Sequence, residues 1–335
     1  MKILYAVQGT GNGHLSRAME VIPCLQQLGD VDILVSGTQG DLQLPFPVTY
    51  AFKGLSFVFG KSGGVDLWKT FRKANLPVLS KTIHGLPVEK YNLVISDFEP
   101  VSAWACYLKS LPCIALSHQA AVLSPKAPAA KKVDRMGQLI LNHYAPTTDK
   151  YGFHFETYED TTFTPVIRKA VREQETGNLG HYTVYLPAYD DERLIKRLAG
   201  FTEVQWEVFS KHNTKPRQLS NIRIEPVNGD KFIQSMAFSA GVLCGAGFET
   251  PAEALYMGKK LLVVPMKNQY EQHLNAASLA KMGVPVIKSL KAKHEQAISS
   301  WLQSGTVIPV EYPDRTQEIV NFVVAQHANS AIKSI

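Results

Sequence analysis

Short apolar runs alternate with longer amphipathic stretches in the first part of the chain. The apolar runs predict strands over Lys2–Val7, Val31–Ser36, Leu93–Ser96 and Cys113–Leu116. The stretches between them predict helices over Leu15–Leu28, Val65–Ile83 and Pro100–Leu108. Strands that alternate with helices of this length form βαβ units around a parallel sheet. The first part therefore predicts a doubly wound α/β domain.

The same alternation restarts after a polar and charged segment that lies between about Phe155 and Asn178. Further strands are predicted over Tyr182–Leu186, Val204–Phe209, Ile222–Glu225, Gly241–Cys244 and Lys260–Val264. Further helices are predicted over Asp190–Leu198, Asp230–Phe238, Pro251–Met257, Gln269–Lys281 and Arg315–Ala331. We therefore expect an α/β protein of two doubly wound, Rossmann-like domains that face each other across a cleft.

The expected boundaries are a first domain over residues 1–155, a linker over 156–180, a second domain over 181–314 and a C-terminal helix over 315–335. Ligands of open parallel sheets bind at the carboxyl ends of the strands. The loops that follow strands are therefore where function is to be sought.

Composition agrees with a folded chain, because 45% of the 335 residues are hydrophobic and 19% are charged. These values exclude a disordered, collagen-like or coiled-coil protein. No apolar stretch approaches the ~18 residues of a membrane span, and the first residues lack the features of a signal peptide. The four cysteines, Cys24, Cys106, Cys113 and Cys244, show no CxxC spacing. We expect them to be reduced thiols of a cytoplasmic protein.

The net charge is +6, and most of it lies in the first 150 residues, where 15 Lys and Arg stand against 10 Asp and Glu. Such an excess suits nucleic acid, an anionic membrane or an anionic substrate, or it simply faces solvent. The chain has no zinc-finger spacing, RNP-type motif or long basic run, so we expect no nucleic-acid partner.

The first predicted strand leads into a glycine loop, Gly9-Thr10-Gly11-Asn12-Gly13-His14. The loop lacks the third glycine of a dinucleotide fingerprint and the Gly-Lys-Ser/Thr of a P-loop. Its glycines either make a tight turn or leave room for a ligand at the start of the next helix. His14 would lie at that helix start, where the positive end of the helix dipole favours a neutral imidazole. His14 is therefore a candidate general base, with a structural role as the alternative.

The most specific stretch is Gly241–Gly283. A strand ends at Gly245-Ala246-Gly247, and Thr250 and Pro251 are suited to begin a helix. Glu253 stands three residues after Thr250, which is the spacing of a capping box, so the alternative to a binding role is that Glu253 only caps the helix. The glycine loop and helix start are also suited to phosphates. Glu271, Gln272 and Asn275 then begin a further helix, where a carboxylate and amides together can bind sugar hydroxyls or simply face solvent.

This stretch resembles the donor-binding motif of GT-B fold glycosyltransferases, in the MurG-like and UDP-glycosyltransferase-like group. The residues that match in order and spacing are Gly245, Gly247, Thr250, Glu253, Pro265, Glu271, Gln272, Asn275 and Ala276. The loop Gly9–His14 is similar to the N-terminal glycine loop of the same families. The two motifs, one in each predicted domain, thus resemble the same families.

The resemblance implies a role for each matched residue. Glu253 would bind the ribose hydroxyls of a nucleotide, the loop Gly245–Gly247 and Thr250 would face its diphosphate, and Glu271 and Gln272 would hold the donor sugar. The first domain, with Gly9, Gly11 and Gly13, would be the acceptor side. His14 would be the general base on the acceptor hydroxyl or a group that orients this hydroxyl. Asp97 resembles the carboxylate that supports this histidine in some members, or else caps the helix near Pro100. Glu271 replaces the Gln or Asp common at its position, which leaves the donor sugar open.

The implied reaction transfers a sugar from a nucleoside-diphosphate-sugar, a UDP-sugar by resemblance, to an acceptor hydroxyl with inversion. The nucleotide-sugar is a substrate, so we expect no cofactor. No metal is required on this account, although scattered carboxylates can also assemble a metal site. The alternatives are a nucleotide-sugar epimerase on the same fold and a non-catalytic nucleotide-sugar-binding subunit.

The acceptor would be a lipid, a glycan or a small molecule. Trp68, Phe71, Arg72 and Lys73, together with Lys131, Lys132 and Arg135 ahead of Leu139–Leu141, combine basic and apolar side chains. They either cover an ordinary exposed helix face or contact an anionic membrane surface that carries a lipid-linked acceptor. A peripheral position at the inner face of the membrane would follow from the second alternative.

Overall fold

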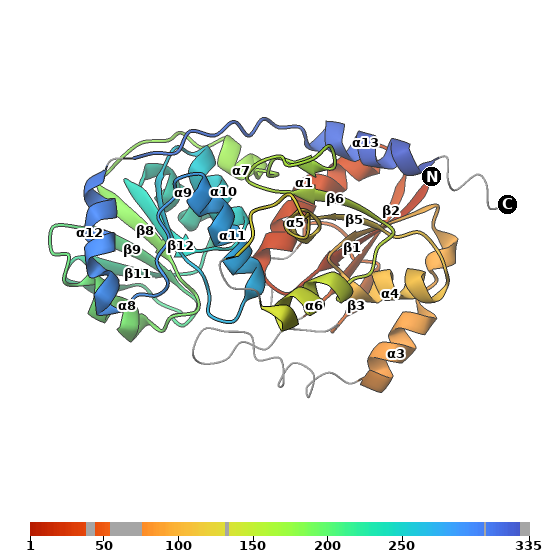
Figure 1. The fold of residues 1–335 in the computed structure, drawn as a ribbon, viewed down its shortest axis with the longest axis horizontal. Helices are drawn as coiled ribbons and strands as arrows, with labels where there is room; N and C mark the ends of the chain where they lie inside the picture. Colours follow the sequence, from red (N-terminus) through yellow and green to blue (C-terminus); the bar gives the residue numbers. More distant parts are fainter. Residues whose placement is uncertain (38–43, 54–75, 131–133, 305, 329–335) are drawn as a thin grey trace.

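Two α/β halves lie side by side in the computed structural model, and each is built around one twisted sheet (Figure 1). The structure describes residues 1–37, 44–53, 76–130, 134–304 and 306–328. The first half contains the start of the chain and its last described helix. The second half contains residues from about 181 to 304.

The first sheet has the strand order β3-β2-β1-β4-β5-β6-β7, and all of its strands are parallel. Its strands are β1 (Lys2–Gln8), β2 (Asp30–Ser36), β3 (Tyr50–Phe52), β4 (Leu93–Asp97), β5 (Ile114–Ser117), β6 (Asp149–Phe153) and β7 (Thr162–Phe163). The helices of this half are α1 (Asn12–Gln26), α3 (Leu76–Gly85), η1 (Val88–Lys90), α4 (Pro100–Leu108), α5 (His118–Val122), α6 (Arg135–His143) and α13 (Thr316–Ala328).

The second sheet has the order β10-β11-β9-β8-β12-β13 and is parallel except for the pair of β10 with β11. Its strands are β8 (His181–Tyr185), β9 (Gln205–Ser210), β10 (Arg217–Leu219), β11 (Ile222–Pro226), β12 (Gly241–Gly245) and β13 (Lys260–Val264). The remaining helices are α7 (Lys169–Arg172), α8 (Asp191–Leu198), α9 (Gly229–Phe238), α10 (Glu249–Tyr256), α11 (Tyr270–Lys281), η2 (Ala292–His294) and α12 (Glu295–Ser304).

Strand β1 explains why the pattern of apolar residues predicted a buried parallel strand. Its odd-numbered residues, such as Ile3 and Tyr5, join the core that also contains α1, whereas Leu4 and Ala6 join the core beneath α4. A parallel strand that is covered on both faces has no polar face, so it reads as one continuous apolar run. The expected doubly wound architecture is confirmed for both sheets.

Each sheet reverses its winding direction at one place, and these two places matter for function. In the first sheet β1 lies between β2 and β4, and in the second β8 lies between β9 and β12. The loops after the two central strands leave in opposite directions at such a place and open a crevice at the carboxyl ends. The crevices therefore lie after β1 and β4, and after β8 and β12.

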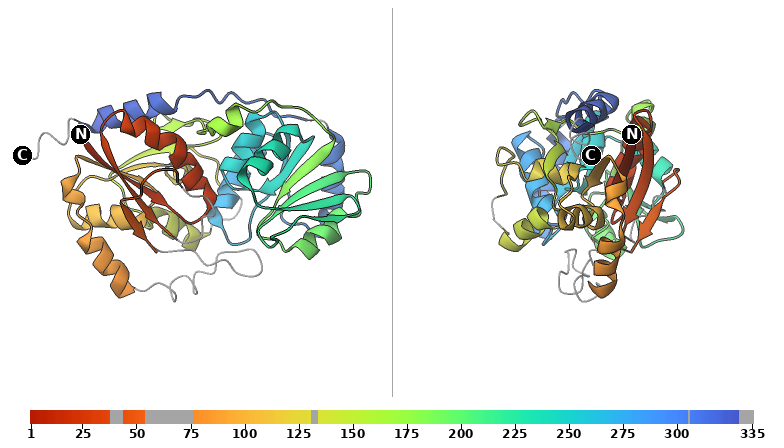
Figure 2. Two further views of the ribbon diagram at one scale, coloured as in Figure 1. Left: turned by 180° about the vertical axis from the view of Figure 1, so that it is seen from behind. Right: turned by 90° about the vertical axis from the view of Figure 1, so that its right-hand side faces the viewer.

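The segment expected as a linker, 156–180, is only partly a connection. Its residues Thr162–Phe163 form β7 and pair with β6, so the first sheet extends into it. The chain returns to the first half after α12, and α13 packs against α1 (Figure 2). The expected helix Val65–Ile83 is described only from Leu76, as α3, and the part before it lies outside the described residues.

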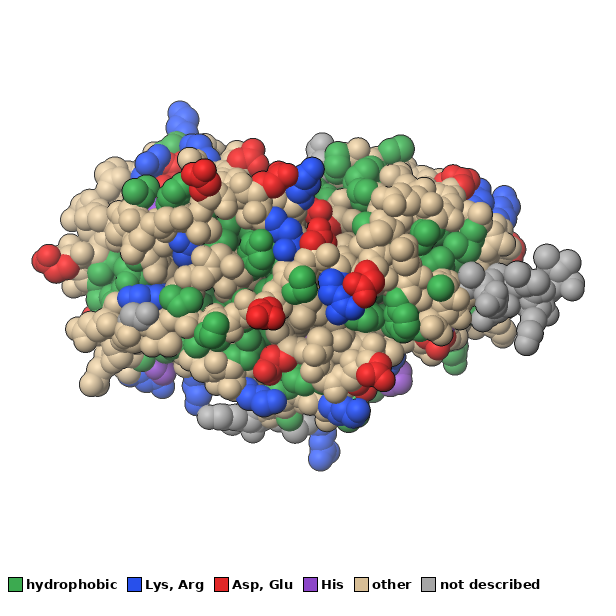
Figure 3. All heavy atoms as spheres, turned by 90° about the horizontal axis from the view of Figure 1, so that it is seen from above, with side chains coloured by type: hydrophobic (Ala, Val, Ile, Leu, Met, Phe, Trp, Pro, Cys, Tyr) green, Lys and Arg blue, Asp and Glu red, His purple; other side chains and the backbone are tan. Residues whose placement is uncertain are grey.

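All four cysteines are free thiols, and all except Cys24 are buried. None of the helices in the described ranges combines the length and the apolar character that crossing a bilayer requires. The face drawn in Figure 3 carries basic and acidic side chains interspersed, so the net positive charge does not form one basic field there.

Candidate functional site

His14 and Asp97 meet at the crevice of the first sheet. His14 lies in the first turn of α1, which follows β1, and Asp97 is the last residue of the neighbouring strand β4. The His14 Nδ1 and Asp97 Oδ1 atoms are 2.8 Å apart. The carboxylate is fully buried, whereas 14% of the imidazole is exposed. Asp97 thus orients a ring whose other edge remains accessible.

The alternative that Asp97 caps a helix is wrong. Glu99 is the N-cap of α4, and its carboxylate accepts hydrogen bonds from the backbone N–H groups of Val101 and Ser102, both at 2.7 Å. Phe98 has a φ of 55° and turns the chain between the strand and the helix. Asp97 therefore remains at the strand end, facing α1.

The glycine loop shapes the start of α1. The N–H of Gly9 donates to the Ser36 carbonyl at 2.6 Å, which ties the loop to the end of β2. Gly11 is the N-cap of α1 and has a φ of 93°, a value that strains any residue with a Cβ. The loop therefore needs glycine for its backbone conformation at Gly11.

Arg17, which was not among the predicted site residues, binds the same carboxylate. Its Nε donates to Asp97 Oδ2 at 2.9 Å, and its Nη2 donates to Asp97 Oδ1 at 2.7 Å. Burial raises the pKa of Asp97, but Arg17 and His14 outweigh it and hold that pKa below its ordinary value. Burial likewise opposes the charge of Arg17, but Asp97 and Glu249 raise its pKa above the ordinary value. Both groups are therefore charged at neutral pH.

Glu249, from the second half of the molecule, also belongs to the network of His14, Asp97 and Arg17. It is the first residue of α10, and its Oε1 accepts from Arg17 Nη1 at 2.5 Å. A Cβ at Gly13 would collide with the Glu249 carboxylate, so a larger residue there would displace this side chain from its position beside Arg17. The two halves are thus joined by an ion pair directly beside His14.

Glu271 and Gln272 lie on the opposite wall, in the first turn of α11. The Glu271 Oε2 atom accepts from the Gln119 amide at 3.2 Å, and the same amide nitrogen lies 3.5 Å from His14 Nε2. Burial raises the pKa of Glu271, and the bond from Gln119 only partly offsets this effect. Gln272 is more constrained, because its Oε1 accepts from the Met266 N–H at 2.8 Å.

These residues line one cavity of about 300 Å³ between the halves. His14, Gly11 and Gly13 contribute from the first half, and Gly247, Glu271 and Gln272 contribute from the second. An adjoining cavity of about 90 Å³ lies at the crevice of the second sheet, between the loop after β8 and the loop after β12. Gly245, Gly247 and Thr250 line the smaller cavity, and Gln272 lines both.

Glu253 does not form the expected capping box. The helix begins at Glu249, two residues before Pro251, and its N-cap Phe248 makes no side-chain bond. Pro251 still fits, because the N–H groups of a first turn have no partner within the helix. The Glu253 carboxylate instead accepts from Arg168 Nε and Nη2 at 2.6 and 2.7 Å. It is nearly fully buried and lines neither of the two cavities.

His118 and Asn275 hold the two halves together behind the cavity. The buried His118 ring stacks on Phe248 with centroids 3.9 Å apart, and its Nε2 lies 2.8 Å from the amide of Asn275. Asn275 also donates to the carbonyl of Ala246 at 3.1 Å, which fixes the loop after β12. Burial lowers the pKa of His118 to about 3, so its ring is neutral.

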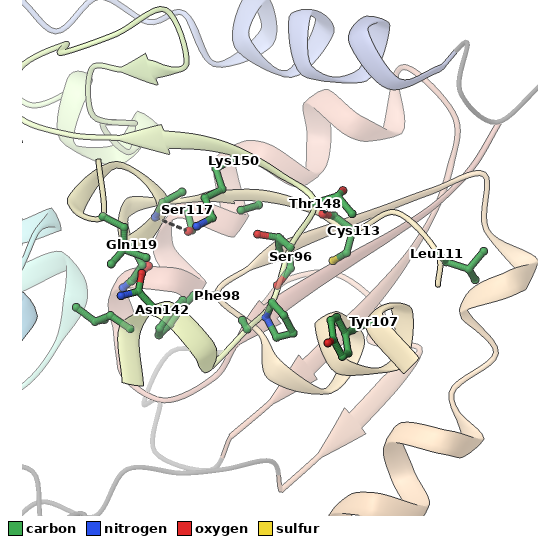
Figure 4. A pocket seen from close by; sticks show the side chains of 17 residues that line it. Ser96, Phe98, Tyr107, Leu111, Cys113, Ser117, Gln119, Asn142, Thr148 and Lys150 are labelled. Carbon is green, nitrogen blue, oxygen red and sulfur yellow. Dashed lines mark hydrogen bonds between the residues drawn. The ribbon is translucent and has the colours of Figure 1, made fainter. Parts of the chain in front are cut away.

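A further pocket of about 320 Å³ lies between α4 and α6, above the carboxyl half of β5. Figure 4 shows that it extends from Phe98 and Gln119, next to the cavity between the halves, to Leu111. Phe98, Gln119 and Leu141 line both spaces. The pocket thus adjoins His14 on the side of the first half.

Among the described residues, no group of three or more His, Cys, Asp and Glu side chains is arranged to hold a metal ion. The predicted absence of a metal from the reaction is not tested by this observation and stays a prediction.

The chain matches a family model described as glycosyl transferase family 1 over residues 1–304. MurG of Acinetobacter baumannii has a similar structure, with a TM-score of 0.56 and 16% identity over 97% of this chain and 99% of that chain. UGT2 of Phytolacca americana, complexed with UDP-2fluoro-glucose and pterostilbene, has a TM-score of 0.57 and 13% identity over 98% and 94%. The glycotransferase of kitacinnamycin has a TM-score of 0.56 and 12% identity over 98% and 95%.

No curated protein sequence matches the chain. The solved structures are too distant in sequence to show more than the fold, which is that of GT-B glycosyltransferases. The family model covers most of the chain, including both glycine loops and all the residues of the cavity between the halves. The chain therefore belongs to glycosyl transferase family 1 and is a glycosyltransferase with two Rossmann-like domains.

Proposed function

We propose that this glycosyltransferase moves a sugar from a nucleoside-diphosphate-sugar, a UDP-sugar by its resemblance to the MurG-like group, to an acceptor hydroxyl. The observation that carries the proposal is the bond of 2.8 Å between His14 and Asp97 at the wall of the cavity between the halves. An ionised carboxylate can only accept a hydrogen bond, so the Nδ1 atom that bonds to it carries the hydrogen. The free electron pair is then on Nε2, which is the atom that takes the acceptor proton.

The reaction is a single displacement at the anomeric carbon. The acceptor oxygen attacks as His14 removes its proton, the nucleoside diphosphate leaves from the opposite side, and the configuration is inverted. The backbone N–H groups of the loop Gly245–Gly247 and the start of α10 bind the departing phosphates. Glu249 already occupies the start of α10, so the diphosphate shares that position with a carboxylate.

The donor nucleotide is assigned to the region of the smaller cavity after β8 and β12, because dinucleotide and nucleotide ligands bind where a parallel sheet reverses its winding. Thr250 and the two glycines line that cavity. Glu271 and Gln272 lie between it and His14, where the donor sugar would be. For Glu253 to bind the ribose, its carboxylate must exchange Arg168 for the ribose hydroxyls.

The acceptor enters through the pocket between α4 and α6, which adjoins His14 and is lined mainly by the first half. A lipid, glycan or small-molecule acceptor agrees with its mixture of apolar side chains and hydroxyl groups. Contact with an anionic membrane surface stays a proposal. Six of the residues that suggest it lie outside the described residues: Trp68, Phe71, Arg72, Lys73, Lys131 and Lys132. Arg135 and Leu139 are exposed on α6, whereas Ile140 is half-buried and Leu141 is buried. Co-sedimentation with anionic vesicles at low salt tests it, and absence of binding refutes it.

Membership of a glycosyltransferase family argues against both alternatives, the epimerase and the non-catalytic subunit. One experiment separates the three. The chain is screened by thermal shift against nucleotide-sugars, because saturation at ~100 times the dissociation constant adds about 2.7 kcal/mol of stability. The sugar that binds is then incubated with candidate acceptors. Release of the nucleoside diphosphate that depends on the acceptor, with an inverted glycoside as product, supports transfer. A new sugar isomer without acceptor supports epimerisation, and binding without turnover supports the subunit.

A further inference from the structure

Arg17 stands three residues after His14 and therefore lies on the same face of α1. Its side chain is 2% exposed, and its guanidinium lies over the ring of Phe153 at 5.7 Å. Its polar edge donates to Asp97 from β4 and to Glu249 from α10, and its Nη2 lies 3.1 Å from the Nδ1 atom of His14. Arg17 thus contacts both halves of the molecule and the candidate base.

The contacts of Arg17 determine how strongly Asp97 can favour a charged imidazole. Asp97 Oδ2 is bound by Arg17, and Oδ1 is shared between Arg17 and His14. The guanidinium thus neutralises the carboxylate and places a positive charge beside the ring. Both effects disfavour a second positive charge on His14. Without Arg17, Asp97 would hold the imidazolium strongly, and a protonated ring cannot act as a base.

Glu249 has the opposite effect. It binds the far side of the guanidinium and offsets part of its positive charge. It belongs to the helix that follows the glycine loop of the second half, so its position depends on where that half lies. Glu271 of α11 is a further acidic group at this cavity, and its carboxylate also favours a charged ring. His118 of α5 is neutral and contributes no charge.

We propose that Arg17 is a positioning residue that keeps His14 in its neutral, base-competent form, and that Glu249 of the donor half sets the strength of this effect. The proposal rests on the proposed role of His14 as the base. The donor half would thereby influence proton transfer on the acceptor side without touching the acceptor.

The test is a titration of the histidine rings by ¹⁵N NMR in the full chain, with no ligand present. The His14 signal is the one that disappears in His14→Gln. Arg17→Met should move the midpoint of the His14 titration to higher pH, equivalent to at least about a tenfold gain in proton affinity. Arg17→Lys, which keeps the charge, should recover most of the difference. Glu249→Gln should move the midpoint to lower pH. Glu295→Gln, which removes an exposed charge from α12 in the second half, is the matched control and should have no effect.

Shifts of the His14 midpoint in opposite directions in Arg17→Met and Glu249→Gln support the proposal. Loss of packing alone would not move the midpoint in opposite directions in the two variants. If Arg17→Met does not fold, Glu249→Gln decides: a lower midpoint supports the proposal, and an unchanged or higher midpoint overturns it. An unchanged midpoint in a folded Arg17→Met also overturns it. The pH profile of nucleotide-sugar turnover is then recorded for the same variants. If the NMR midpoint moves while the acidic limb of the profile does not, Arg17 tunes His14 but His14 is not the base.

Discussion

His14 and Asp97 are 83 residues apart in the sequence, and yet their side chains share a hydrogen bond because β1 and β4 are neighbours in the sheet. The helix after β1 turns toward one side and the chain after β4 toward the other. The crevice between them holds the imidazole, and the buried end of β4 holds its partner. The same place in the second sheet carries the glycine loop proposed to bind the diphosphate.

Replacing His14 tests the base. His14→Ala should lower turnover by about 100- to 10,000-fold, the usual contribution of general acid–base catalysis, and should remove the acidic limb of the pH profile. The dissociation constant of the donor should barely change, because the loop Gly245–Gly247 and the first turn of α11 belong to the other half. Steady-state kinetics and calorimetry measure the two effects.

Asp97→Asn is expected to cost less activity than His14→Ala, but it also removes the charge that balances Arg17. Its melting temperature must therefore be measured beside its activity. An active but less stable His14→Ala with an unaltered pH profile would mean that His14 is structural, and Asp97 would then be the leading candidate base.

Substitutions of Glu253 and of Arg168 are expected to differ in their effects on nucleotide binding. Glu253→Gln should weaken the binding of uridine diphosphate by about 1.5–3 kcal/mol, the value of a charge-assisted hydrogen bond. Arg168→Gln leaves the carboxylate free for the ribose and should not weaken binding. Both variants should lower the melting temperature, because each breaks a buried ion pair. If calorimetry shows that Glu253→Gln binds uridine diphosphate with unchanged affinity, the Glu253–Arg168 ion pair has a structural role only.

The contact between Gly13 and Glu249 can be tested by a double-mutant cycle. Gly13→Ala should destabilise the folded protein, because its Cβ displaces the Glu249 carboxylate. Adding Glu249→Ala should relieve the collision, so the double variant should be more stable than the sum of the single effects predicts.

Gly11→Ala is the matched control for this cycle. A Cβ there meets no atom within 4 Å, and its cost of about 1 kcal/mol comes from the positive φ. Glu249→Ala should therefore not rescue it. Equal rescue of both alanine variants in urea unfolding would refute the proposed contact.

The buried histidines predict how stability depends on pH. Burial lowers the pKa of His118 to about 3 and that of His154 to about 2, whereas the unfolded chain keeps the ordinary value near 6.5. Below pH 6.5 the unfolded state therefore binds protons that the folded state does not. The free energy of unfolding should fall by about 1.4 kcal/mol per pH unit for each histidine, until the pH reaches the folded values.

Urea unfolding between pH 7 and pH 4.5 measures this slope. His118→Gln should reduce this slope by the contribution of one histidine, whatever the effect of the substitution on stability at pH 7. His143→Gln changes an exposed histidine and should leave the slope unaltered. A slope that is the same in all three proteins would contradict the neutral state of His118.

The pattern of apolar residues predicted β1, β2, β4 and β5 because parallel strands in the centre of a sheet are apolar on both faces. It missed β6, which begins with Asp149 and Lys150 and contains Gly152, so its sequence has no apolar run. It also missed the short strands β3, β7 and β10 and the helices α5, α6, α7 and α12. The short strands depend on their neighbours more than on their own sequence. Helix α6 did have a local signal, because the Asp134 side chain at its N-cap accepts a hydrogen bond from the Gly137 N–H.

The sequence predicted those residues of the candidate site whose role can be inferred from the residues next to them in the chain. His14 after a glycine loop and Gln272 at a helix start have such local signals. Arg17 and Glu249 do not, because their contact joins residues 232 positions apart. The spacing of Thr250 and Glu253 predicted a capping box, which the structure does not form. Arg168, which is 85 residues away, binds the Glu253 carboxylate instead. An arginine one turn after the candidate base was the available clue to Arg17.

The two passages of the chain between the halves run along the same edge of the molecule, one before β8 and one after α12 (Figure 1). They are bound to each other, because Arg172 donates to the Tyr312 carbonyl at 2.9 Å and the Tyr312 hydroxyl donates to the Phe155 carbonyl at 3.0 Å. One hydrophobic cluster also runs through both halves, with Leu15 and Ile22 of α1 and Ala252 and Leu255 of α10 among its members. The two halves are therefore held to each other both along this edge and through their shared core.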